Sequence, residues 1–451
     1  MSIVFVILAW TGLALAALSV VGWAVTFGST VATLCLLGLH WRLRRAGLAD
    51  EAARLARPLP PDPDLPDVVV QIPTFNEGTM VARALAAATA LDWPQDKLHI
   101  QVLDDSTDDS VAIARAEVEA CRARGFDVAL IHRTDRSEFK AGALANAMGL
   151  TPHGYFAILD VDYVPAPDFL RRTMACLLAE PQLGFIQARF DYLNADANAL
   201  TRAQAVLLDA HLAIEQATRS WAGHPLPFNG TCGVWRREAI EQAGGWHGDT
   251  LAEDLDLSYR AWRLGWRGRF LMTVPVPGEL PDTMPVWKTQ QRRWAKGFGE
   301  VTIRTLGPIL ADRTLPLRTR LAVLLHLGVW WSGPSWALAL PTGVVAIVLN
   351  PSLFGSLGLL LIAQLVVGYV MLFAFLWAGR RSLRPAAARL GRFLGDFVGV
   401  SRKLSALGGT VGAAQREAIF RKRSDFVRTP KNAIRNPGSP GDAHAPQPGP
   451  P

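Results

Sequence analysis

Two long stretches without a charged residue constrain the fold of this chain more than any other feature. Residues 2–39 contain no Asp, Glu, Lys or Arg, and residues 321–379 contain none either. A helix needs about 20 apolar residues to cross the hydrocarbon core of a bilayer, and both stretches exceed that length. The residues between them are mixed in composition and contain many charges. The sequence therefore predicts a globular domain held between membrane-spanning segments.

The number of crossings follows from segment length and from proline. As a single helix, residues 2–39 would extend roughly 57 Å, against a bilayer core of about 30 Å, so they form either one long helix or a tight hairpin. Residues 321–379 are expected to hold two helices that are broken at Asn350-Pro351. Proline removes a helical donor and disfavours helix in the residue before it.

Clusters of arginine border both apolar stretches and indicate their orientation. The first cluster follows the first stretch, the second precedes the second stretch, and the third follows it. They are, in that order, Arg42, Arg44 and Arg45; Arg313, Arg318 and Arg320; and Arg380, Arg381 and Arg384. If the second stretch crosses twice, all three clusters lie on one side, and the positive-inside tendency makes that side the cytoplasm. We therefore expect a multi-pass protein of the plasma (inner) membrane with a cytosolic domain.

The net charge of +7 has a simple explanation in these juxtamembrane clusters. Anionic lipid attracts such clusters, so membrane lipids are expected partners. The basic residues do not form one aromatic-interleaved stripe, and no nucleic-acid partner is expected. The four cysteines are far apart and form no CxxC pair, so their spacing suggests neither a zinc site nor a disulfide framework.

The chain divides into six predicted parts. They are an N-terminal membrane segment over 1–41, a linker over 42–66, a cytosolic domain with interface helices over 67–312, two membrane helices within 313–379, a basic amphipathic or weakly membrane-embedded segment over 380–435, and a disordered tail over 436–451.

Strand and helix patterns alternate in the first part of the globular domain. Strands are expected over 67–75, 98–104, 127–132 and 155–160, with helices near 77–90, 108–124 and 139–149. Such alternation predicts an α/β fold with a mostly parallel sheet and helices on both faces. Ligands of open sheets of this kind bind beyond the carboxyl ends of the strands. The polar residues that follow each strand are therefore the candidates for function.

Two of these strand ends are acidic. Asp160-Val161-Asp162 follows an apolar strand, and two carboxylates one residue apart can hold one Mg²⁺ or Mn²⁺ ion. The alternative is a solvated turn. Asp104-Asp105-Ser106 ends another strand, where a carboxylate can contact a nucleotide. The alternative there is a helix N-cap by Ser106 or Thr107.

An acidic pair opens a later helical stretch. Glu253 and Asp254 lie in Leu251-Ala252-Glu253-Asp254-Leu255-Asp256. A carboxylate at a helix start is favoured by the helix dipole, which keeps it ionised as a general base requires. The alternative is a favourable helix-start charge without a chemical role.

The most specific segment of the sequence is Gln290-x-x-Arg293-Trp294. Arg293 offers fixed donors for a diphosphate, and the indole of Trp294 offers a flat face to a sugar ring. An amphipathic helix on the membrane surface is the alternative. Two further segments are candidates only in combination with these motifs. Lys140 could meet phosphate or be an exposed lysine at a helix start. The small-residue loop Asn229-Gly230-Thr231-Cys232-Gly233 could let the backbone approach a substrate closely or be a structural turn.

Together these residues resemble the processive glycosyltransferases of family 2, the superfamily of cellulose and hyaluronan synthases. The family pattern of D, DxD, (T/E)ED and QxxRW appears here in order and at similar spacing, over roughly residues 67–310. The phrases VQIPTFNE, QVLDDSTD, FKAGAL, FNGTCGVWR and QQRRW resemble in particular the cellulose-synthase-like glucomannan 4-beta-mannosyltransferases. Ala252 replaces the first residue of the TED motif, and Cys232 replaces an alanine.

The resemblance implies a role for each matching position. It implies a GT-A domain in which Asp254, beside Glu253, is the base that deprotonates the acceptor, and in which Asp160 and Asp162 hold Mg²⁺ or Mn²⁺. The nucleotide-sugar would contact Thr74, Asn76, Glu77, Asp104, Asp105, Lys140 and Asp160. The diphosphate and the acceptor would contact Gln290, Arg293, Trp294 and Cys232.

Three functions remain open from the sequence. The first is an inverting hexosyltransferase that moves mannose from GDP-mannose, or glucose from UDP-glucose, to a growing β-1,4-linked polysaccharide. The second is a single addition to a lipid-linked acceptor. The third is a non-catalytic membrane scaffold, against which the intact Asp160, Asp162, Asp254 and Arg293 argue.

Overall fold

The computed structural model describes residues 3–422 of the chain. Its centre is a seven-stranded sheet in the order β3-β2-β1-β4-β6-β5-β7. The strands are β1 (Val68–Thr74), β2 (Leu98–Asp104), β3 (Asp127–His132), β4 (Tyr155–Ile158), β5 (Leu183–Tyr192), β6 (Gly233–Arg236) and β7 (Arg267–Gly278). The tail expected over 436–451 lies outside the described residues.

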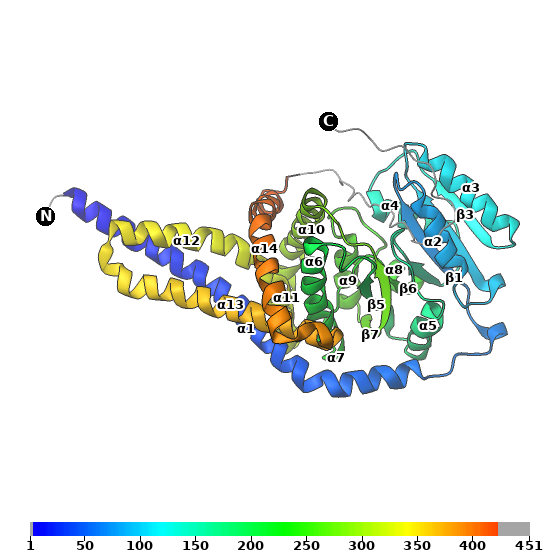
Figure 1. The fold of residues 1–451 in the computed structure, drawn as a ribbon, viewed down its shortest axis with the longest axis horizontal. Coiled ribbons are helices and arrows are strands. Elements are labelled where there is room, and N and C mark those ends of the chain that lie inside the picture. The colour runs from blue at the N-terminus through cyan, green and yellow to red at the C-terminus, as the bar shows by residue number, and fades with distance from the viewer. Residues whose placement is uncertain (1–2, 423–451) are drawn as a thin grey trace.

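The sheet is mostly parallel, which confirms the predicted α/β fold. Strand β1 pairs in parallel with β2 and with β4, and β2 pairs in parallel with β3. Strand β6 is antiparallel to both of its neighbours, and β5 is parallel to β7. Helices α2 (Met80–Thr89), α3 (Ser110–Ala123), α4 (Phe139–Gly149), α5 (Phe169–Ala179) and α8 (Arg237–Gln242) flank it (Figure 1).

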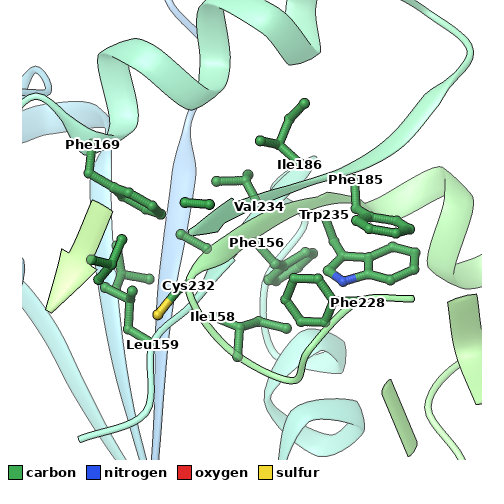
Figure 2. Packing of buried hydrophobic residues seen from close by; sticks show 14 of the residues in the cluster. Phe156, Ile158, Leu159, Phe169, Phe185, Ile186, Phe228, Cys232, Val234 and Trp235 are labelled. Carbon is green, nitrogen blue, oxygen red and sulfur yellow. The ribbon is translucent and has the colours of Figure 1, made fainter. Parts of the chain in front are cut away.

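The largest side chains of the hydrophobic core lie on the central strands, where β6 runs between β4 and β5. Phe156, Phe185 and Trp235 are almost completely buried, and the rings of Phe185 and Trp235 stack with centroids 4.5 Å apart. Figure 2 shows Phe228 and Cys232 among the same apolar side chains. This packing fixes the ends of β4 and β6, from which the candidate site is built.

Three helices are long and apolar enough to cross a membrane within the part of the chain that the structure describes. Helix α1 (Ile3–Leu55) is one continuous helix of 53 residues, so no hairpin forms. Helices α12 (Ser332–Leu349) and α13 (Leu359–Leu383) are separated by an irregular segment that begins at Pro351, where the proline predicted a break. The three helices extend together away from the domain (Figure 1).

Helix α1 continues past its apolar part and packs along the globular domain. The carboxylate of Glu51, which is 2% exposed, accepts hydrogen bonds from the backbone N–H groups of Met272 (3.0 Å) and Thr273 (2.7 Å). The linker expected over 42–66 is therefore wrong for 42–55. Side-chain contacts to β7, which a sequence pattern does not reveal, keep this part helical.

Helix α14 (Leu390–Ile419) packs on the domain and is not among the candidate spans of residues 3–422. Its buried residues Phe393, Val400 and Leu407 recur every seven positions. They face α6 (Ala199–Ala210), α13 and α10 (Met284–Ala311), the long helix that carries Gln290 to Trp294. Of the segment expected over 380–435 to be amphipathic or weakly embedded, residues 390–419 form an amphipathic helix with its apolar face on the protein, and residues 423–435 lie outside the described part.

A buried ion pair joins the end of α13 to α6. Arg380 donates to Asp209 at 2.6 Å, and the two side chains are 4% and 0% exposed. Arg384, just beyond α13, lies 3.6 Å from Asp209 and also contacts Asp191 of β5. These charges fasten the membrane helices to the domain that holds the site.

We expect Asp209→Asn to loosen this junction. The substitution leaves Arg380 buried without its carboxylate, which typically costs about 3–5 kcal/mol. The melting temperature of the detergent-solubilised protein should fall clearly. The matched control is Asp249→Asn, because Asp249 and Arg304 form a 3.0 Å pair with both side chains about half exposed. That change should cost no more than about 1 kcal/mol, and equal losses in both variants would contradict the role of burial.

Candidate active site

The loops that follow β1 and β2 are bonded to each other at the carboxyl edge of the sheet. Asn76 takes a left-handed conformation with φ of 53°, and its backbone N–H donates to Ser106 Oγ at 2.8 Å. Its side-chain oxygen accepts from the backbone of Thr107 at 2.9 Å. Ser106 and Thr107 therefore do not cap the next helix as expected, since these groups bridge the two loops and α3 begins at Ser110. Thr74 is the last residue of β1, and Glu77 lies in the loop that follows it.

The adjacent aspartates after β2 have different surroundings. Asp104 is 1% exposed and accepts from the backbone N–H of Ser106 at 3.1 Å and from His132 Nδ1 at 2.9 Å. Asp105 receives two parallel bonds from Arg133, Nε to Oδ1 at 2.8 Å and Nη2 to Oδ2 at 2.6 Å. Asp104 therefore holds the loop, and Asp105 holds the guanidinium of Arg133.

Two arginines of this region carry no motif and were missed from the sequence. One is Arg133, described above; the other is Arg136, whose guanidinium lies 3.4 Å from the centre of the Phe75 ring. Their positions depend on the turn between β3 and α4, where Glu138 and Phe139 both have positive φ. The sequence feature that could have pointed to both arginines is a basic residue within a few positions of a strand end.

Lys140 lies at the start of α4 and points across the sheet edge. Its ammonium donates to Asp160 Oδ1 at 2.6 Å and to the carbonyl of Gly230 at 2.9 Å. Burial alone would lower the pKa of Lys140, but the carboxylates of Asp160 and Glu253 raise it above its usual value. The lysine therefore remains charged, and it can meet an anionic phosphate.

Asp160 and Asp162 lie directly after β4, as the strand pattern predicted. The backbone N–H of Asp160 donates to Thr231 Oγ1 at 2.8 Å, and Asp162 is 1% exposed. Two carboxylates in one turn are a hard oxygen set of the kind that Mg²⁺ or Mn²⁺ prefers. The ammonium of Lys140 beside Asp160 shows that this position suits a cation, so the residues fit a divalent ion.

The loop Asn229–Gly233 brings the backbone next to Asp254. Gly230 has φ of +80°, and a Cβ atom there would lie 2.9 Å from Asp254 Oδ2. Only glycine fits this approach. Asn229 is held from both sides, because its N–H donates to Gln187 Oε1 at 2.8 Å and its Oδ1 accepts from Gln216 at 3.0 Å. Both glutamines were missed, since their roles arise only in the folded chain.

Cys232 lies in the same loop but faces inward. It has φ of 59° and is completely buried, and Figure 2 shows its sulfur beside Ile158 and Leu159. Burial raises the pKa of the Cys232 thiol well above its usual value. A packing role therefore explains its thiol without any contact to a ligand.

Asp254 lies in the first turn of α9 (Glu253–Arg263). Burial and the charge of Glu253 raise its pKa to about 7, and the N–H of Leu255, Lys140 and Arg293 oppose this only in part. We expected the helix start to keep this carboxylate ionised, but burial and the charge of Glu253 raise its pKa instead. A carboxylate with a pKa near neutral is suited to accept a proton at physiological pH.

This pKa predicts the pH dependence of activity and its change in Glu253→Gln. A base acts in its deprotonated form, so kcat/KM should rise as the pH increases through about 7 and then level off. Removal of the Glu253 charge lowers the pKa of Asp254, so the rising limb should move to lower pH. Initial rates from pH 5.5 to 9 measure the shift. A limb that moves to higher pH, or not at all, would contradict the proposed coupling.

Helix α10 brings the Gln290–Trp294 segment close to Asp254. A Cβ atom at Gly297 would meet the backbone of Leu251 and Ala252 at 2.7–2.8 Å, so α10 touches the segment that leads into α9. Glu300 Oε2 also accepts from the N–H of Leu251 at 2.9 Å. Arg293 is near enough to lower the pKa of Asp254, and Gln290 is half-buried on the same helix. Trp294 is 41% exposed.

The site therefore joins strand-end carboxylates, a lysine, a partly buried carboxylate of raised pKa and an arginine-tryptophan helix at one edge of the sheet. A family model described as glycosyl transferase family group 2 matches residues 155–378. The chain carries a family 2 glycosyltransferase domain. The match includes the DxD, Glu253-Asp254 and Gln290–Trp294 segments, as well as α12 and most of α13.

Curated relatives and a solved structure are similar to this chain. It is 40% identical over 271 residues to "Probable glucomannan 4-beta-mannosyltransferase 6" of Oryza sativa subsp. japonica, covering 58% of the chain and 45% of the relative. "Glucomannan 4-beta-mannosyltransferase 2" of Arabidopsis thaliana is 41% identical over 238 residues, 52% of the chain and 45% of the relative. The chain thus spans about half the length of these relatives.

The solved structure supports the fold. A mannosyltransferase from Pyrobaculum calidifontis, PcManGT, solved in complex with GDP-Man and Mn²⁺, superposes with a TM-score of 0.59. It shares 21% identity and covers 91% of this chain and 100% of its own. The likeness shows that the two chains share a fold that includes the GT-A type sheet.

Proposed function

We propose that this protein is an inverting hexosyltransferase that elongates a β-linked polysaccharide from a nucleotide-sugar donor at the cytosolic face of the plasma (inner) membrane. The observation that carries the proposal is the convergence at Gly230. Asp254 lies against Gly230, whose carbonyl accepts from Lys140, and Lys140 in turn donates to Asp160. A proton acceptor and a phosphate-binding cation are thus held on either side of one short loop.

Each group has a distinct task in a single displacement. Asp254 takes the proton from an acceptor hydroxyl, and the oxygen attacks the anomeric carbon of the donor from the side opposite the leaving diphosphate. An α-linked donor then gives a β product. Lys140 and Arg293 offset the negative charge that develops on the leaving diphosphate. Asp105, with Thr74, Asn76 and Glu77 beside it, faces the nucleotide.

A divalent ion completes this site in the proposal. Asp160 and Asp162 would hold Mg²⁺ or Mn²⁺, and the bound ion supplies positive charge beside the diphosphate. Mn²⁺ in the related mannosyltransferase structure supports this assignment.

The donor we propose is GDP-mannose, with UDP-glucose as the alternative. The names of the curated relatives and the GDP-Man in the structural relative support mannose. Membranes that contain the protein should incorporate labelled mannose from GDP-mannose into a product that a β-mannanase degrades. If label is incorporated from UDP-glucose and not from GDP-mannose, the transferred sugar is glucose. Absence of turnover with either donor would count against catalysis.

A single addition to a lipid-linked acceptor is the second candidate. The observation in its favour is that α14 packs on the domain, so only three candidate spans lie within residues 3–422. Three helices are few for a closed path through the membrane. The size of the product distinguishes the two candidates: polysaccharide synthesis gives long chains on a sizing gel, whereas single addition gives one lipid-linked species.

A further inference from the structure

A cluster of two imidazoles and two carboxylates lies at the edge of the sheet remote from Asp160. Asp67 precedes β1, His99 is the second residue of β2, and His153 precedes β4. Asp127 is the first residue of β3. All four therefore lie at the N-terminal ends of parallel strands, whereas Asp160 follows a C-terminal end. The proposed chemistry uses none of them.

The polar atoms of this cluster converge on one point. His99 Nε2 lies 2.9 Å from Asp67 Oδ1, and His153 Nδ1 lies 3.9 Å from the same oxygen. One ligand atom from each of the three residues lies within 4.8 Å of the other two. Ligands about 2 Å from a common tetrahedral ion are separated by roughly 3.3 Å, so these atoms need to move by only about an ångström.

A carboxylate on the far side of His99 completes the pattern. His99 Nδ1 lies 2.6 Å from Asp127 Oδ2. Metal-bound histidines usually donate their second ring N–H to a carboxylate or carbonyl, which fixes the tautomer and the orientation of the ring. With its proton on Nδ1 toward Asp127, His99 presents the lone pair of Nε2 toward Asp67 and His153.

The backbone holds these ligands in place before any ion binds. Strand pairing sets Val69 opposite His99 and Val68 opposite Tyr155, so the residues before β1 and β4 are adjacent. Arg237 donates to the carbonyl of His153 at 2.7 Å, which fixes the loop before β4. The folded sheet thus already holds the three ligands close together, so little further conformational entropy is lost when an ion binds.

We propose that Asp67, His99 and His153 form a binding site for a transition-metal ion of the Zn²⁺ class, with Asp127 orienting His99. Imidazole with carboxylate suits Zn²⁺, whereas the all-carboxylate pair at the other edge suits Mg²⁺ or Mn²⁺. The imidazole rings of His99 and His153 are parallel at 3.9 Å, so binding requires a turn of the His153 ring. That side chain is 24% exposed.

The site would be structural, because it joins β2, β1 and β4 far from the base. An ion that binds only the folded chain stabilises it, and once the ion concentration exceeds Kd the stabilisation grows with the logarithm of that concentration. The alternative is a cluster without metal, in which a protonated His99 bridges Asp67 and Asp127. The two arrangements differ in stoichiometric metal binding and in the dependence of that binding on His153.

The experiment uses the purified full chain in detergent, stripped of metal, with Asp162→Asn introduced so that the other metal site does not contribute. Calorimetric titration with Zn²⁺ should show one equivalent bound, and Co²⁺ should give the visible absorption of a four-coordinate ion. Zn²⁺ should raise the melting temperature more than Mg²⁺ does. Failure of the proposed transfer activity would leave these readouts unchanged.

Matched variants identify the ligands. His99→Asn and His153→Asn should each weaken Zn²⁺ binding at least ~10-fold, and Asp127→Asn about 10-fold. The control is His247→Asn, a half-buried histidine elsewhere in the domain, which should bind as before. If His99→Asn misfolds, the loop variant His153→Asn still decides. No bound equivalent, or equal binding in His153→Asn and in the control, would overturn the proposal.

Discussion

Asp254→Asn should reduce the rate of sugar transfer by about 10²–10⁴-fold, the range that a positioned base typically supplies, while donor binding stays close to that of the unmodified protein. The amide has the size of the carboxylate, and its oxygen can still accept the 2.8 Å bond from Leu255 N. What it lacks is a site that takes a proton at neutral pH. Nucleotide release measures turnover, and fluorescence or calorimetric titration with intact donor measures binding.

Two comparisons make this result specific. Asp249→Asn changes an exposed carboxylate four residues before α9, so its turnover should match that of the unmodified protein. Donor affinity shows whether Asp254 acts as a base or as a structural group. Substitution of a base lowers turnover and leaves donor affinity unchanged. Transfer within tenfold of normal in Asp254→Asn would remove Asp254 from the role of base, and a joint loss of turnover and donor binding would assign it to donor binding or folding.

The first half of the sheet could be predicted from the sequence because its strands and helices alternate without interruption. Strands over 98–104 and 127–132 have the predicted bounds, and helix α4 does as well. The second half could not be predicted. Strand β6 has four residues and runs antiparallel to its neighbours, and β7 contains prolines that argue against a strand. The sheet tolerates them because β7 is an edge strand that pairs with β5 alone, and prolines are accepted at a sheet edge.

The candidate site divides in the same way. Asp160, Asp254 and Lys140 could be found because strand ends and helix starts can be located from local pattern. Arg133 and Gln187 could not, since each gains its role from a partner far along the chain or across a turn. The pKa of Asp254 also depends on burial and on Glu253 together, and a sequence does not give the balance between desolvation and the helix dipole.

Asp162→Asn is the second substitution for which we expect a large loss, about 10²–10³-fold in turnover. Asp162 is 1% exposed at the end of β4, and its neighbour Asp160 already shares its charge with Lys140 at 2.6 Å. With Asp162 neutral, one carboxylate and an adjacent ammonium remain, and together they carry no net negative charge to attract a divalent cation. The concentration of Mn²⁺ or Mg²⁺ needed for half-maximal activity should therefore rise steeply.

The metal titration distinguishes this cause from general damage. Asp168→Asn changes a carboxylate that is 56% exposed before α5, and its metal dependence should be unaltered. His99→Asn, at the other edge of the sheet, should likewise keep the Mn²⁺ dependence of transfer. If Asp162→Asn loses turnover with an unchanged half-maximal metal concentration, Asp162 acts in positioning the donor and the ion is held elsewhere. If the half-maximal metal concentration rises in Asp162→Asn and in neither control, the catalytic ion binds at the end of β4. The reason is that Asp162 supplies one of the two carboxylates proposed to hold the ion there.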